Sequence, residues 1–137
     1  MTYKLLMVDD EEEIRDLLSR HFRFLGYDVR TAAEGKEALA LLEKETFDIV
    51  ITDIMMPGMD GIELTAEIRS QYPMIKVIVI TGQVTMVNLL ATIRHGAENI
   101  IFKPLSNMQE LEETVAHSAK VIERWKMKLQ QLSALKA

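Results

Sequence analysis

The fold of this chain is decided by two apolar segments that each end in aspartate, Leu5-Leu6-Met7-Val8-Asp9-Asp10 and Ile49-Val50-Ile51-Thr52-Asp53. Their apolar residues run consecutively, which is typical of strands buried on both faces of a parallel sheet. If the two strands are neighbours, Asp9, Asp10 and Asp53 converge at one edge of that sheet. Carboxylates held so close repel one another unless a proton or a cation intervenes, and oxygen ligands suit a hard divalent ion such as Mg²⁺. The two segments therefore predict a parallel sheet with a metal site at its edge.

Strand-like runs alternate with helical patterns along the rest of the chain. The predicted strands are Leu5–Val8, Asp28–Thr31, Phe47–Thr52, Lys76–Ile80 and Asn99–Phe102. Helical spacing predicts a first helix that stops at Gly26 and further helices over about residues 34–43, 61–71 and 86–95. This alternation predicts an α/β fold with a doubly wound, five-stranded parallel sheet. Right-handed crossovers give the strand order 2-1-3-4-5, a flavodoxin-like topology in which the first and third strands are neighbours.

Two more polar residues are predicted at the same edge of the sheet. Ligands of doubly wound sheets bind beyond the carboxyl ends of the strands, at the point where the winding reverses. Thr81 follows the fourth predicted strand and Lys103 follows the fifth, so both should face the crevice that holds the aspartates. Carboxylates, a hydroxyl and an ammonium group together predict a phosphoryl-handling site, because phosphoryl transfer depends mainly on positioning and charge neutralisation.

Composition narrows the class of protein. A chain of 137 residues, 48% of them hydrophobic, suits one ordinary globular fold. The absence of cysteine excludes disulfides and thiolate metal sites, and we expect a cytoplasmic protein. The net charge of -5 gives no support for direct binding of nucleic acid, and no apolar run is long enough to span a membrane.

Four motifs at the predicted strand ends are similar to those of one family. They are Val8-Asp9-Asp10-Glu11, Asp53-Ile54-Met55-Met56-Pro57-Gly58-Met59-Asp60-Gly61, Thr81-Gly82 and Lys103-Pro104. In this order they resemble the receiver domain of bacterial two-component response regulators, related to the chemotaxis receiver, from Lys4 to about Ala119. The resemblance implies a phosphorylation-activated signalling switch rather than an enzyme. The implied partner is a sensor histidine kinase or a histidine phosphotransfer protein.

The resemblance also implies a role for individual residues of the site. Asp53 is the expected phosphoacceptor. Asp10 and Asp53, with the backbone carbonyl of Met55, are the expected Mg²⁺ ligands, while Asp9 is expected to act mainly through a bound water. Lys103 is expected to pair with the acceptor carboxylate and then with a phosphoryl oxygen.

Thr81 and Ile100 are the expected switch residues. The resemblance implies that Thr81 donates its hydroxyl to a phosphoryl oxygen. The family usually has an aromatic side chain three residues before the lysine, which rotates inward when the threonine moves. That position is Ile100 here, and a branched aliphatic side chain cannot swing a ring between inside and outside. Phe102, two residues along, is expected to point to the same face as Ile100.

Helix-compatible sequence continues from about Asn107 to the end of the chain without glycine or proline. A heptad seam runs along it, formed by Met108, Leu111, Val115, Ser118, Ile122, Trp125, Leu129 and Leu132. We predict a receiver domain over residues 1–119 and an extended C-terminal helix over residues 120–137. Nothing in a receiver domain is expected to cover the seam beyond Ala119, which favours a parallel homodimer with Trp125 as its central anchor. A truncated linker and a docking helix for another protein are the alternatives.

Two other functions share part of this pattern. An aspartate-based phosphatase of the haloacid dehalogenase type also uses an aspartate at a strand end, but it usually needs a second aspartate two residues later, where this chain has Met55. A flavodoxin-like flavin binder cradles phosphate with hydroxyls and amides in its first loop, and the acidic run 9–13 has the wrong charge for that purpose. The sequence therefore favours the switch over both.

Overall fold

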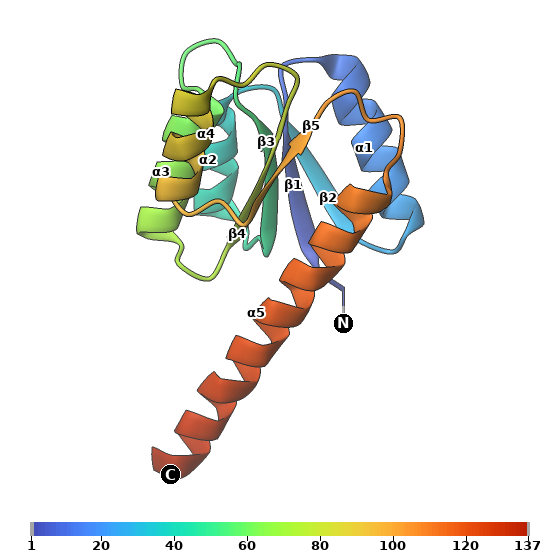
Figure 1. Ribbon diagram of the computed structural model, residues 1–137. Helices are drawn as coiled ribbons and strands as arrows, with labels where there is room; N and C mark the ends of the chain where they lie inside the picture. The colour runs from blue at the N-terminus through green and yellow to red at the C-terminus, as the bar shows by residue number, and fades with distance from the viewer. Residues whose placement is uncertain (1, 137) are drawn as a thin grey trace.

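The computed structural model describes residues 2–136 and contains a five-stranded parallel sheet of order β2-β1-β3-β4-β5. The strands are β1 (Lys4–Val8), β2 (Asp28–Ala32), β3 (Ile49–Asp53), β4 (Lys76–Thr81) and β5 (Asn99–Phe102). The helices are α1 (Glu12–Phe24), α2 (Gly35–Lys44), α3 (Gly61–Gln71), α4 (Met86–Arg94) and α5 (Gln109–Lys136). The predicted fold class, strand order and extended C-terminal helix are confirmed (Figure 1). Only the last residue of the predicted helix, Ala137, lies outside the described residues.

Helices cover both faces of the sheet, with α1 and α5 on one side and α2, α3 and α4 on the other (Figure 1). Successive residues of a strand point to opposite faces, so β1 contributes to two hydrophobic clusters. Leu5 packs in the cluster that contains Phe22 of α1 and Leu111 of α5. Leu6 packs in the cluster that contains Ala38 of α2. This two-sided burial explains the consecutive apolar residues of the central strands.

The parallel register brings the carboxyl ends of the strands to one edge of the sheet. Val8 of β1 is opposite Thr52 of β3, and Asp53 is opposite Ile80 of β4. The residues that follow β1, β3, β4 and β5 therefore lie around one crevice, as expected at the point where the winding reverses.

The docked part of α5 is longer than the sequence predicted. Ile122 is 1% exposed and belongs to the cluster beside α1, so the expectation that nothing covers it is wrong. The Tyr3 hydroxyl donates to Glu123 Oε2 at 2.9 Å, and Lys126 Nζ lies 3.6 Å from Asp48 Oδ1. These contacts hold α5 against the amino-terminal end of the sheet as far as Lys126.

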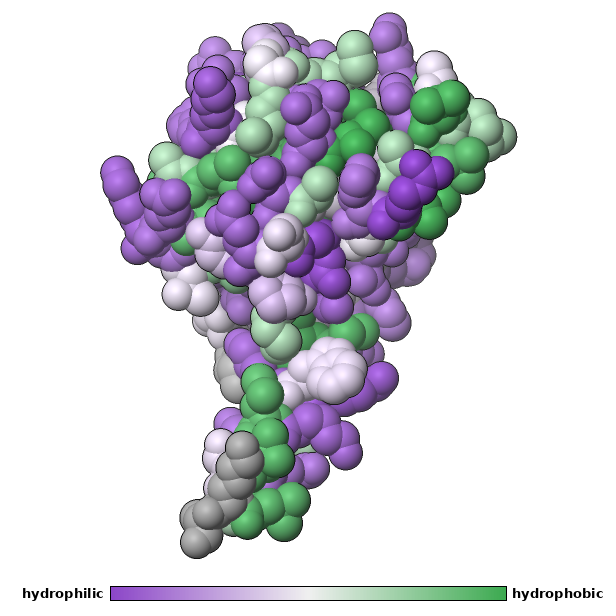
Figure 2. Space-filling model, turned by 90° about the vertical axis from the view of Figure 1, so that its left-hand side faces the viewer, coloured by the Kyte–Doolittle hydropathy of each residue, from purple (hydrophilic) through white to green (hydrophobic). Residues whose placement is uncertain are grey.

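Beyond Lys126 the helix projects away from the sheet (Figure 1). Figure 2 shows hydrophobic side chains along this projecting segment. In this segment Leu129 and Leu132 are about half exposed, at 54% and 48%, and so is Trp125, at 54%, just before it. Among residues 2–136, no helix is long and apolar enough to cross a membrane.

Candidate functional site

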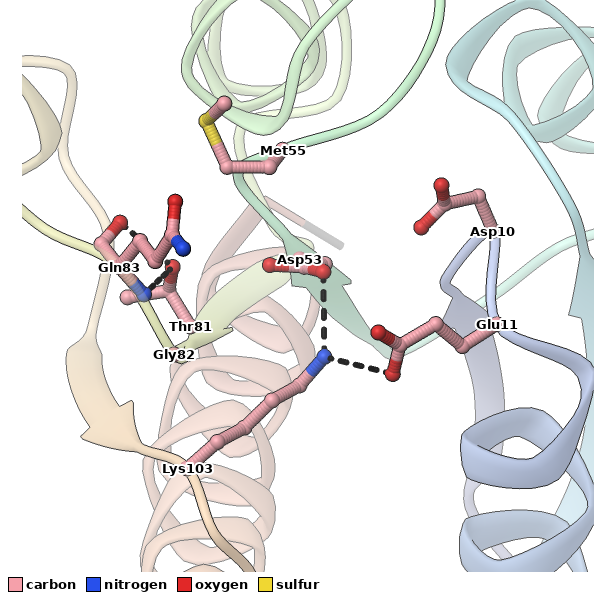
Figure 3. Close-up of a pocket in the computed structure, with 8 residues that line it drawn as sticks. All are labelled: Asp10, Glu11, Asp53, Met55, Thr81, Gly82, Gln83 and Lys103. Atoms are coloured by element: carbon pink, nitrogen blue, oxygen red, sulfur yellow. Dashed lines mark hydrogen bonds and ion pairs between the residues drawn. The ribbon is translucent and has the colours of Figure 1, made fainter.

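The three aspartates predicted to converge lie together at the carboxyl ends of β1 and β3. One carboxylate oxygen from each of Asp9, Asp10 and Asp53 lies within 4.8 Å of the other two. Asp9 and Asp53 are buried, at 3% and 6% exposure, whereas Asp10 is exposed. A pocket of about 410 Å³ opens beside them (Figure 3), lined by Asp10, Glu11, Asp53, Met55, Thr81, Gly82, Gln83 and Lys103. The topology thus assembles the predicted carboxylates, hydroxyl and ammonium around one opening.

Lys103 places a cation among the carboxylates. Its Nζ lies 3.1 Å from Asp9 Oδ2, 3.1 Å from Asp53 Oδ2 and 3.5 Å from Glu11 Oε2. Burial by itself would lower the pKa of Lys103, but hydrogen bonds and charges from Asp9 and Asp53 outweigh burial and raise it. Burial raises the pKa of Asp9, while the Glu11 amide and Lys103 oppose that shift. The lysine is therefore a charged group held between two buried carboxylates.

Both the side chain and the backbone of Asp53 are held in place. The Ile54 amide donates to Asp53 Oδ1 at 2.7 Å, and Lys103 donates to Oδ2 at 3.1 Å. The Thr52 hydroxyl donates to the backbone carbonyl of Asp53 at 2.9 Å. A Cβ atom at Gly61 would lie 1.9 Å from the same carbonyl oxygen, so glycine alone fits there. The carboxylate consequently faces the pocket in one fixed orientation.

The hydroxyl of Thr81 is engaged in a local turn. Thr81 Oγ1 donates to the carbonyl oxygen of Gln83 at 3.0 Å and accepts from the Gln83 amide at 3.3 Å (Figure 3). Thr81 is fully buried as a residue, yet it lines the pocket. Its hydroxyl must therefore leave this turn before it can donate to a ligand in the pocket.

The other residues singled out in the sequence lie at different depths. Met55 is 55% exposed and lines the pocket. Ile100 is half-buried and packs against the cluster on the α2 and α3 side of the sheet, away from the pocket lining. Phe102 is 54% exposed.

Two residues at the site were missed by sequence reasoning, Glu11 as a contact of Lys103 and Gly61 as a close neighbour of Asp53. Glu11 occupies the N-cap position of α1, where short polar side chains are preferred. A long glutamate at this position is the sequence signal that its side chain has another partner. Gly61 is the first residue of α3, and a glycine at such a position signals a close backbone approach.

The donor set fits a hard divalent cation. Carboxylate oxygens from three aspartates converge, and such oxygens are the ligands that Mg²⁺ prefers. The mutual repulsion of these carboxylates also favours a bound cation. The acidic cluster is therefore consistent with a Mg²⁺ site.

Comparison with known families identifies the chain. Residues 5–116 match the response regulator receiver domain. The chain belongs to this family, and it is a phosphorylation-activated switch of two-component signalling that accepts a phosphoryl group rather than a classical enzyme. Receiver domains have histidine kinases as partners.

Solved structures of receiver proteins superpose closely on this fold. The receiver domain protein (CheY-like) of Methanospirillum hungatei JF-1 is 32% identical, with a TM-score of 0.87 over 90% of this chain and 98% of that one. The response regulator TrrA of Thermotoga maritima, solved in complex with Mg²⁺ and BeF, is 35% identical, with a TM-score of 0.78 over 85% and 99% of the two chains. The chemotaxis protein CheY4 of Vibrio cholerae is 34% identical, with a TM-score of 0.79 over 86% and 99%.

Proposed function

We propose that Asp53 accepts a phosphoryl group from the phosphohistidine of a sensor histidine kinase or of a histidine phosphotransfer protein. The observation that carries this proposal is the orientation of the Asp53 carboxylate, which faces the pocket between the Ile54 amide and the Lys103 ammonium. In the transfer, one carboxylate oxygen forms a bond to phosphorus while the phosphorus–nitrogen bond breaks, and the histidine nitrogen keeps the electron pair. Positioning and charge neutralisation supply most of the catalysis of such a step.

The remaining polar groups have complementary roles in this proposal. Asp10, Asp53 and the backbone carbonyl of Met55 would hold Mg²⁺, and Asp9 would act mainly through a bound water. When bound, the ion neutralises the carboxylates and the phosphoryl oxygens that approach them. Lys103 already lies within hydrogen-bonding distance of Asp53, and its ammonium pairs with a phosphoryl oxygen during the transfer.

Thr81 and Ile100 form the switch in this proposal. Once Asp53 carries a phosphoryl group, the Thr81 hydroxyl exchanges its bonds with Gln83 for one to a phosphoryl oxygen. The loop that follows β4 moves with it. Ile100 lies opposite Val79 of β4 in the sheet and responds by a shift in packing, since it has no ring to rotate.

We place this exchange in the cytoplasm, where receiver domains usually act. The cysteine-free sequence suits a reducing compartment. The partner surface that changes on phosphorylation is then presented to other cytoplasmic proteins.

Intact-mass measurement after treatment with phosphoramidate and Mg²⁺ tests the acceptor. We expect one added phosphoryl group on the unaltered chain, and none on Asp53→Asn or on the unaltered chain in excess chelator. Asp28→Asn, the same chemical change at a residue paired with Arg30 outside the pocket, should be modified normally. Equal modification of Asp53→Asn contradicts the assignment.

We also propose that the chain divides into a receiver domain (1–119) and a helical extension (120–137), whose projecting end forms a parallel homodimer. The half-exposed stripe of Trp125, Leu129 and Leu132 supports this, because it continues the helix face that Ile122 buries against the sheet. Full burial of such a side chain contributes roughly 1.5–3 kcal/mol.

Light scattering with and without beryllofluoride tests the homodimer. Leu129→Glu should dissociate it, whereas Gln130→Glu introduces the same charge at the next residue, off the stripe, and should not. A version ending at Arg124 keeps Ile122 and removes the whole stripe, so it should be monomeric. A monomeric unaltered chain at tens of micromolar under both conditions contradicts the homodimer.

A further inference from the structure

The side chain of Glu11 does not cap the helix that this residue begins. Glu11 is the N-cap residue of α1, yet its side chain makes no capping hydrogen bond. Instead, Oε2 lies 3.5 Å from Lys103 Nζ at the pocket (Figure 3). The Glu11 amide donates to Asp9 Oδ1 at 2.9 Å, which fixes the backbone from which this side chain extends. The carboxylate is therefore held beside the site by its backbone and by attraction to Lys103.

The charge of Glu11 is poorly neutralised at this point. Its carboxylate is not among the oxygens that converge as the candidate metal ligands, which come from Asp9, Asp10 and Asp53. Lys103 lies closer to Asp9 and Asp53 than to Glu11. The Glu11 side chain is 60% exposed, so it stands where a phosphoryl donor must enter from solvent.

We propose that Glu11 selects among phosphoryl donors, disfavouring small, free, highly charged donors such as acyl phosphates. This inference rests on the proposed function of Asp53. The Glu11 carboxylate repels an entering phosphoryl group and competes with it for Lys103. A donor carried on a partner protein gains docking energy elsewhere on the surface, which a small free anion lacks. The charge of Glu11 therefore acts on the entering donor and on Lys103. Glu11 is a selectivity residue rather than a catalytic one.

The effect of the Glu11 charge on the reaction rate should depend on the charge of the donor, as acetyl phosphate and phosphoramidate illustrate. An Asp53 carboxylate oxygen forms a bond to phosphorus, the phosphorus–oxygen bond to the acetyl group breaks, and acetate leaves with the electron pair without needing a proton. Near neutral pH acetyl phosphate carries more negative charge than phosphoramidate, whose transfer releases ammonia after its nitrogen is protonated. Repulsion by Glu11 should therefore slow acetyl phosphate more than phosphoramidate.

Initial rates of phosphorylation at saturating Mg²⁺, followed by intact mass, test this inference. Glu11→Gln should accelerate the reaction with acetyl phosphate about fivefold at low ionic strength, and the reaction with phosphoramidate by less. Glu13→Gln removes the same charge from an exposed residue two positions along that does not line the pocket, and should change either rate less than about twofold. The gain for Glu11→Gln should shrink at high ionic strength, because salt screens the exposed carboxylate.

Three outcomes overturn the inference: equal acceleration by Glu11→Gln and Glu13→Gln, equal acceleration with the two donors, or slowing of both donors by Glu11→Gln. If the proposed function itself is wrong, the result is different: the unaltered chain takes no phosphoryl group on Asp53 from either donor.

Discussion

The two ends of the parallel sheet are built by different means. At the carboxyl end, the buried carboxylates of Asp9 and Asp53 share the Lys103 ammonium. Gly61 lies so close to the backbone carbonyl of Asp53 that a Cβ atom would not fit between them. At the amino-terminal end, Ile122 is buried in the core and polar contacts lie around it at the margin. The site thus depends on polar contacts of fixed geometry, whereas the attachment of α5 depends mainly on apolar burial.

The largest effect on stability is expected at the apolar end. Ile122→Ala should lower the free energy of unfolding by about 2–5 kcal/mol, because it leaves a cavity beside α1. Leu129→Ala, on the same helix face beyond the sheet and 54% exposed, should change it by less than about 0.5 kcal/mol in the monomer. Urea unfolding at low protein concentration measures both. Similar losses would mean that α5 is not divided into a docked and a projecting part.

At the polar end the largest effect is expected on phosphorylation. Lys103→Ala removes the cation shared by Asp9 and Asp53 and should slow phosphorylation by phosphoramidate about a hundredfold. Thr81→Ala leaves those groups in place, so the acceptor should still react at a rate within about tenfold of normal. Its deficit should appear in the response, seen as smaller amide NMR shifts after β4 and along β5 when beryllofluoride is added. Wild-type behaviour of both variants in both assays contradicts these roles.

A smaller effect on stability, with a consequence for the site, is expected at Gly61. Gly61→Ala forces a Cβ against the Asp53 carbonyl and should cost about 1–3 kcal/mol of stability, together with slower phosphorylation. Gly82→Ala is the matched control for unfolding, because its Cβ would lie 3.6 Å from the Lys103 Cβ, an ordinary contact. If the two substitutions have the same effect on the free energy of unfolding, the close approach at Gly61 is not a constraint on the fold.

The same contrast explains what could be predicted from sequence. Buried parallel strands leave consecutive apolar runs, and the residues that end them converge once the strand order is known, so Asp53 and Lys103 could be placed at one crevice. The coverage of Ile122 could not be predicted, because it depends on the direction in which α5 crosses the sheet. That direction involves contacts such as Tyr3 with Glu123, which are 120 positions apart in the chain. The contact between Glu11 and Lys103 likewise joins two loops, which no local pattern relates.

The smallest effect on stability is expected at the polar contact between Tyr3, beside the sheet, and Glu123 of α5. The Tyr3 hydroxyl donates to Glu123, and burial together with this bond raises the pKa of Tyr3 to about 12. Tyr3→Phe should reduce stability near neutral pH by about 0.5 kcal/mol, because the bond is only partly buried. The folded-state pKa lies above the ordinary value of about 10, so this contribution is fully present below about pH 10 and is lost as the pH rises through about 12. Urea unfolding of both chains at pH 7 and pH 9 should therefore give the same small difference. A difference that disappears by pH 9 would show that the hydroxyl does not keep its proton through this contact.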